Sequence, residues 1–236
     1  MPPHMMMRQF MPLEILAVEL VYFLLVFCLC IFIYYKTRDA YNLTKHQGIF
    51  HFRNIFLYFA LAYAFRLLHI LMMLFMEPHM FQNIRALQPI SLLLVGYFST
   101  MAVLSVAMAI LIKKFKNHKD GLHTLNNSLH IVALILGVVV ALTRSHHVLI
   151  IVLSVLFAFS IIYSISSGKK KKGILSQNKV TYLLLFIFWT LNILSFSKGL
   201  IPWELKIPLY FISAAIFFWV FIRVRKRLFS NAKKKR

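Results

Sequence analysis

The sequence predicts an all-α polytopic membrane protein with seven transmembrane helices, an N-terminus outside and a C-terminus in the cytoplasm. Hydrophobic residues make up 61% of the 236 residues, against roughly 45–50% in soluble domains, and the mean hydropathy is +0.77. Seven long apolar runs with few charges divide the chain. The charged residues are mostly basic and gather in alternate loops between these runs. A soluble fold has too little interior to cover that much apolar surface, so we expect the excess to face lipid.

Each apolar run is a candidate membrane helix, because about 20 helical residues cross the hydrocarbon core of a bilayer. The runs are 11–35, 55–76, 90–112, 129–142, 148–166, 181–196 and 207–222. The fourth, sixth and seventh are short, and the fourth can extend back through Leu125 or on toward His147. A count of six spans, with the fourth run re-entrant, is the alternative.

The loop charges favour seven spans. Four segments, 36–53, 113–119, 169–179 and 223–236, carry 21 of the 27 Lys and Arg residues. Loops rich in Lys and Arg stay cytoplasmic, and only seven crossings place all four segments on one side. We therefore expect one seven-helix domain over 1–222 and a basic cytoplasmic tail over 223–236, in the plasma membrane. The remaining loop cations, Lys206 among them, are expected outside.

The basic clusters have two interpretations. They can be determinants of topology alone, or they can also contact anionic lipid headgroups, which basic residues near the surface attract. The candidate lipid contacts are Lys169, Lys170, Lys171, Lys172, Lys233, Lys234 and Lys235. Because the basic residues follow the apolar runs, we expect the lipid bilayer as the partner and no nucleic acid.

A polar cluster is expected inside the membrane between the first two spans. Glu19 lies about 12 Å from the outer edge of its run and Arg66 about 15 Å, at 1.5 Å per residue. His69 is one helical turn from Arg66, on the same face. Ionisable groups in a membrane are costly unless paired, so we expect Glu19 to contact Arg66 or His69. The cluster is either a proton- or ligand-responsive site or an ion pair that orients two helices.

Motifs that would indicate catalysis or cofactor binding are missing from the sequence. It contains no catalytic motif, no metal-ligand spacing and no phosphate-binding loop, so we expect neither catalytic residues nor a cofactor. The short fourth run suggests a three-plus-one-plus-three arrangement of the kind that small-solute transporters use, although helices broken near the midplane, typical of transporters, are missing.

The segment from Tyr35 to Arg66, with Arg38, Gly48 and Arg53 between them, resembles small uncharacterised seven-helix membrane proteins, chiefly archaeal. More loosely, the layout is similar to the seven-helix sensor region ahead of some histidine kinases. This resemblance implies no catalytic residues, and without an output domain any signalling would pass through a separate cytoplasmic protein. The leading hypothesis is a non-enzymatic sensor or interaction module, and a small-solute transporter is the alternative.

Overall fold

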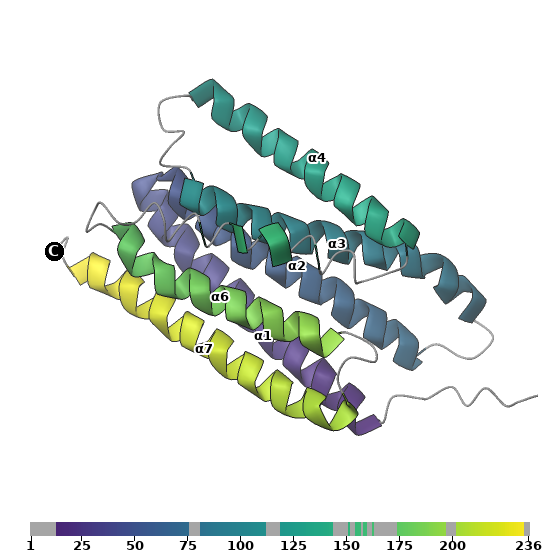
Figure 1. Cartoon of the computed structure of the whole chain (residues 1–236). Coiled ribbons are helices and arrows are strands. Elements are labelled where there is room, and N and C mark those ends of the chain that lie inside the picture. The colour runs from purple at the N-terminus through teal and green to yellow at the C-terminus, as the bar shows by residue number, and fades with distance from the viewer. Residues whose placement is uncertain are drawn as a thin grey trace, which may run out of the picture.

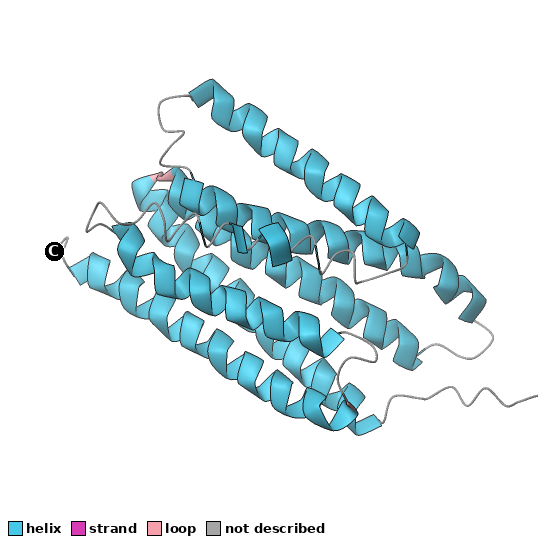
Figure 2. Ribbon diagram, viewed as in Figure 1, coloured by secondary structure: helices cyan, strands magenta, loops and turns pink. Residues whose placement is uncertain are grey.

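The computed structural model describes residues 13–75, 81–111, 119–143, 174–196 and 202–233, with 151, 154–156, 158, 159 and 162. These residues are helical almost throughout, and no strand occurs among them (Figure 2). The long helices, shown in Figure 1, are α1 (Leu13–Thr44), α2 (Gln47–Phe75), α3 (Phe81–Leu111), α4 (Lys119–Thr143), α6 (Ile174–Phe196) and α7 (Trp203–Lys233). The predicted all-helical class is confirmed for the described part of the chain.

Five helical segments are long and apolar enough to cross a membrane. They are Glu14–Thr44, Gln47–Leu68, Pro89–Ala109, Asn126–Thr143 and Glu204–Lys226, and α6 adds a shorter apolar segment, Val180–Asn192. The chain is therefore a membrane protein. The fifth predicted run, 148–166, lies mostly outside the described residues, but its helical positions Ile151, Val155, Phe159 and Ile162 are each more than 60% exposed. Their spacing of three to four residues makes one apolar stripe, as on a helix that faces lipid.

The helices extend beyond the apolar runs. Only Lys45 and His46 separate α1 from α2, where the sequence predicted a loop of nearly twenty residues. Lys45 adopts a left-handed conformation, with φ of 49°, and its N–H donates to the Tyr41 carbonyl at 2.7 Å, which ends α1. His46 Nδ1 then accepts the Gly48 N–H at 3.0 Å and caps α2. The first basic loop is thus mostly helix, and α7 likewise continues through the predicted tail to Lys233.

The helices form a continuous chain of neighbours. The packed pairs are α4 with α3, α3 with α2, α2 with α1, α1 with α7, and α7 with α6, and Figure 1 shows α4 at one edge. The short turn makes α1 and α2 antiparallel neighbours, as the sequence predicted. Tyr22 of α1 contacts Ser213 of α7, and farther along both helices Phe32 contacts Phe221. The residue numbers rise in the same direction on both helices, so α1 and α7 are parallel.

Candidate functional site

Four helices each contribute one polar side chain to a network in the bundle interior. Tyr22 of α1 and Tyr63 of α2 both donate to Asn192 Oδ1 of α6, each at 2.7 Å. Asn192 Nδ2 reaches Ser213 Oγ of α7 at 2.9 Å, and the Tyr22 hydroxyl also bonds Ser213 Oγ, at 2.8 Å. All four residues are buried, at 4% exposure or less. We call Tyr22, Tyr63, Asn192 and Ser213 the polar network.

Asn192 is the centre of this network because its amide oxygen accepts hydrogen bonds and its amide nitrogen donates them. The oxygen accepts two hydroxyl groups, and the nitrogen donates to Ser213 and, at 2.7 Å, to the Phe188 carbonyl of its own helix. A planar amide with this many partners has little rotational freedom. One side chain therefore fixes the positions of α1, α2 and α7 relative to α6.

A charged layer lies one helical turn from the polar network. Glu19 precedes Tyr22 by three residues, and Arg66 follows Tyr63 by three on the antiparallel helix, so both lie on the same side of the network. The Tyr210 hydroxyl of α7 donates to the Glu19 carboxylate, which also interacts electrostatically with Lys206 and Arg66. Glu19 is 9% exposed and Lys206 only 6%. We call Glu19, Arg66, Lys206 and Tyr210 the charged layer.

Arg66 is held by aromatic side chains as well as by charge. Its guanidinium carbon lies 5.7 Å from the centroid of the Tyr63 ring, within the range of a cation–π interaction. The Tyr22 and Tyr210 side chains lie near the same cation. The charged layer and the polar network are therefore one connected site, and it spans α1, α2, α6 and α7.

An aromatic layer closes the other side of the network. Phe59, Phe188 and Phe217 each lie one turn from Tyr63, Asn192 and Ser213 respectively, and Phe56 packs beneath them. Ring centroids are 4.5 Å apart for Phe188 and Phe217 and 6.2 Å for Phe59 and Phe188. The four rings are at most 3% exposed. Polar side chains thus face one half of the bundle, and packed rings separate them from the other half.

A second cation is enclosed by rings beyond the aromatic layer. The Arg53 guanidinium carbon lies 5.1, 5.0 and 5.2 Å from the ring centroids of Tyr34, Tyr41 and Phe50. Its Nε is buried with no hydrogen-bond partner among the described residues. Arg53 is one of the residues whose charge predicted a cytoplasmic loop. In the structure it packs between rings of α1 and α2 beside the turn that joins them.

The predicted site residues have different outcomes. The structure places Glu19 and Arg66 in the same charged layer, and their role stays a prediction. His69 lies one turn farther along α2, but its side chain is outside the described residues, so its contact with Glu19 is untested. Lys233 ends α7. The other candidate lipid contacts, Lys169, Lys170, Lys171, Lys172, Lys234 and Lys235, lie outside the described residues.

The site residues on α6 and α7 were missed by the sequence analysis. Lys206 was expected in an outer loop, but it lies inside α7 and is buried beside Glu19. Asn192, Tyr210 and Ser213 were taken as ordinary members of apolar runs. The available signal was that Asn192 is the one amide in the sixth run, since an amide in lipid requires a partner.

Comparisons with known proteins give one relative. No family model matches the chain, and no solved structure matches it. An uncharacterized protein of Archaeoglobus fulgidus is 28% identical over 234 residues, which cover 97% of this chain and all of that protein. This agrees with the predicted likeness to uncharacterised archaeal proteins. The looser likeness to the sensor region of histidine kinases finds no support in these comparisons.

Proposed function

We propose that this chain is a non-enzymatic membrane sensor or interaction module whose responsive element is the charged layer together with the polar network. The observation that carries the proposal is that α1, α2, α6 and α7 are joined through a single buried amide, Asn192. A change of charge at Glu19, one turn away, alters the electrostatic balance with Arg66 and Lys206. The four helices then have to adjust together.

The proposal includes the predicted topology of seven spans, with the N-terminus outside and the C-terminus in the cytoplasm of the plasma membrane. The five candidate spans, the apolar segment of α6 and the exposed stripe between 151 and 162 support seven crossings. The excess of basic residues in alternate segments supports the orientation. In this orientation the charged layer lies in the outer half of the membrane and the aromatic layer lies toward the cytoplasm. A separate cytoplasmic signalling protein would receive the response.

The alternative function is a small-solute transporter with a three-plus-one-plus-three helix arrangement. A transporter must open the site to both sides in turn. The aromatic layer of Phe56, Phe59, Phe188 and Phe217 favours the sensor, because it fills the interior between the site and the cytoplasmic side with packed rings.

Spin labels on the cytoplasmic ends of two helices test the proposal. Labels at Lys45→Cys and Lys226→Cys, in a background without Cys28 and Cys30, report the distance between the α1–α2 turn and α7. We expect lowering the outer pH from 8 to 5 in proteoliposomes to change the distance distribution, and Glu19→Gln to remove the change. Glu14→Gln is the matched control, because Glu14 is an exposed carboxylate on the same helix.

A flux measurement separates the two functions. Proteoliposomes that contain a pH-sensitive dye should show no proton flux, and those supplied with radiolabelled amino acids or sugars should show no uptake. Flux that Glu19→Gln abolishes and Glu14→Gln preserves would establish the transporter instead. An unchanged distance distribution together with no flux would reject both functions and leave a purely structural cluster.

A further inference from the structure

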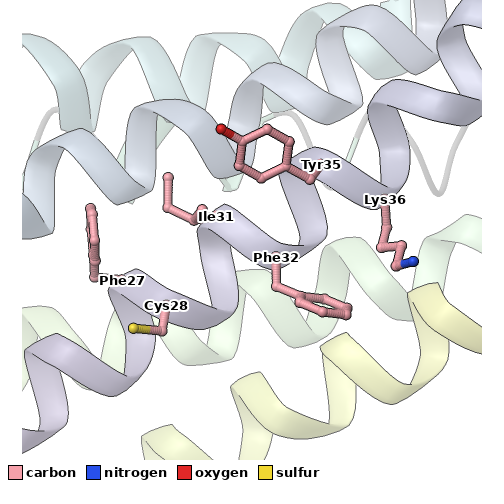
Figure 3. A pocket seen from close by; sticks show the side chains of 6 residues that line it. All are labelled: Phe27, Cys28, Ile31, Phe32, Tyr35 and Lys36. Atoms are coloured by element: carbon pink, nitrogen blue, oxygen red, sulfur yellow. The ribbon is translucent and has the colours of Figure 1, made fainter.

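An apolar groove of about 260 Å³ lies along an exposed face of α1. Figure 3 shows the six side chains that line it: Phe27, Cys28, Ile31, Phe32, Tyr35 and Lys36. Phe27 and Ile31 pack against the core and form the floor. Phe32 and Tyr35, exposed at 45% and 57%, form the rim. The groove faces away from the bundle interior and shares no residue with the polar network or the charged layer.

Neighbouring rings fix the walls of the groove. The Phe32 ring packs against Phe221 of α7, with centroids 5.3 Å apart and planes at 68°. The Tyr35 ring packs against Tyr34 at 5.7 Å. Rings held by such contacts keep their positions without an occupant, so less entropy is lost when a ligand binds.

The charged group of the groove lies at one end. The lining from Phe27 to Phe32 is carbon except for the Cys28 thiol, whereas the Lys36 amine lies at the opposite end, and the Tyr35 hydroxyl points back toward Ile31 (Figure 3). Lys36 Nζ is 5.7 Å from the centroid of the Phe32 ring, so its stem follows the apolar surface while the amine marks the end. The groove is therefore amphipathic along its length.

The length of the groove matches one leaflet of a bilayer. Phe27 and Lys36 are nine residues apart, or about 14 Å along a helix, and half of the hydrocarbon core is about 15 Å. Lys36 is the first basic residue of α1. Other exposed cations, Arg38 on α1 and Arg225 and Lys226 on the parallel α7, lie toward the same end.

We propose that the groove binds one acyl chain of an anionic phospholipid, with the phosphate on the Lys36 amine. The apolar floor suits the chain, and the cation at the leaflet boundary suits the headgroup. A second copy of the protein suits this face less well, because parallel α1 helices across a two-fold axis would bring Lys36 close to Lys36. The site goes beyond the proposed function, and only its place in the cytoplasmic leaflet rests on the proposed orientation.

Native mass spectrometry of the full chain, with phosphatidylglycerol or phosphatidylcholine added, tests the site. We expect one phosphatidylglycerol to be retained about five-fold more tightly than phosphatidylcholine, which corresponds to one lysine–headgroup contact. Lys36→Gln should remove this preference, and Cys28→Trp should fill the groove and prevent retention of either lipid. Arg38→Gln, a nearby exposed cation that does not line the groove, is the matched control. An equal loss with Arg38→Gln and Lys36→Gln would show diffuse attraction and overturn the proposal.

The Cys28 thiol gives a second measurement that needs no groove-filling variant. Cys28 is exposed and Cys30 is fully buried, so an apolar maleimide reports Cys28 alone. Adding phosphatidylglycerol to phosphatidylcholine proteoliposomes should slow its modification several-fold in the native chain and have no effect in Lys36→Gln. No slowing in the native chain would contradict a lipid in the groove. Oxidation that yields dimers linked through Cys28 would identify a second copy as the occupant and would also overturn the proposal. If phosphatidylglycerol protects Cys28 from the outer leaflet, the proposed orientation is wrong, but the groove is still a lipid site.

Discussion

Asn192 shows how one residue can set the arrangement of a membrane bundle. Inside a bilayer, apolar packing alone gives little preference for one helix neighbour over another, because lipid is as apolar as leucine. Hydrogen bonds between helices supply that preference. Asn192 makes such bonds to Tyr22, Tyr63 and Ser213, which come from three other helices. Its amide geometry is therefore the most specific structural constraint in the described residues.

Replacing Asn192 tests this role. Asn192→Ala removes the amide oxygen that accepts from the Tyr22 and Tyr63 hydroxyl groups. We expect a loss of about 1–3 kcal/mol in the free energy of unfolding in detergent, since several interhelical bonds break at once. Thr190→Ala is the control, because Thr190 bonds only the Phe186 carbonyl of its own helix among the bonds described, and it should change stability by less than Asn192→Ala. Equal losses for the two variants would show that the polar network contributes nothing specific.

The charge on Glu19 is the second residue-scale feature. Glu19→Gln removes the carboxylate that interacts electrostatically with both Arg66 and Lys206. We expect a loss of about 3–5 kcal/mol, as for breaking a buried ion pair, and less if water enters. Glu19→Gln combined with Arg66→Met should recover part of the loss, because one cation is then removed with its partner. Denaturation in dodecyl maltoside with increasing SDS measures both. Strict additivity of the two changes would contradict a shared charged layer.

At the scale of elements, α3 and α4 are held by close backbone approach. A Cβ on Gly96 would lie 3.3 Å from Gly137 Cα, and a Cβ on Gly137 would lie 2.9 Å from the Leu93 carbonyl oxygen. Small residues at helix contacts let backbones pack directly. The Tyr97 hydroxyl also bonds His130 Nδ1 of α4 at 2.7 Å. The contact of the edge helix α4 with α3 therefore includes a close approach at two glycines and one polar bond.

The two glycines should respond unequally to alanine. Gly137→Ala meets a backbone oxygen at a distance that real Cβ atoms do not show, so α4 has to shift, at a cost of about 1–3 kcal/mol. Gly96→Ala meets its nearest neighbour at 3.3 Å and should cost less. Disulfide trapping between α3 and α4 cysteine pairs, compared across the two variants, measures the shift. A larger effect from Gly96→Ala would contradict the described packing.

The sequence predicted which segments are helices better than which faces pack. Phe217 is fully buried and Phe218 is 51% exposed, although both are phenylalanine in the same apolar run. In lipid, the interior and the surface of a bundle are equally apolar, so hydrophobic periodicity does not separate them. Glu19 and Arg66 were identifiable because charge is rare in these runs. Ser213 and Tyr210 were not, because they contact Tyr22 and Glu19, which are more than 180 residues away on α1.

At the scale of the whole molecule, the distribution of charge supports the proposed orientation. Twenty-one of the 27 Lys and Arg residues fall in four segments, and the structure shows that parts of these segments belong to helices, as at the α1–α2 turn and along α7. We expect such helical extensions to hold basic side chains near the membrane surface, where anionic headgroups would attract them. The proposed orientation therefore does not depend on loop length.

Accessibility of two introduced cysteines tests the topology and distinguishes seven spans from six. In a background without Cys28 and Cys30, Phe81→Cys should react with a membrane-impermeant maleimide on sealed cells, because 81 follows two crossings from an outside N-terminus. Lys170→Cys should be protected until the cells are permeabilised, because seven spans place 169–179 inside. If the fourth run is re-entrant, the chain crosses the membrane only six times. Position 170 and the basic end of α7 then both lie outside. Labelling of 170 on sealed cells would thus contradict the seven-span orientation, since it exposes Lys169–Lys172 on the side where basic loops are scarce.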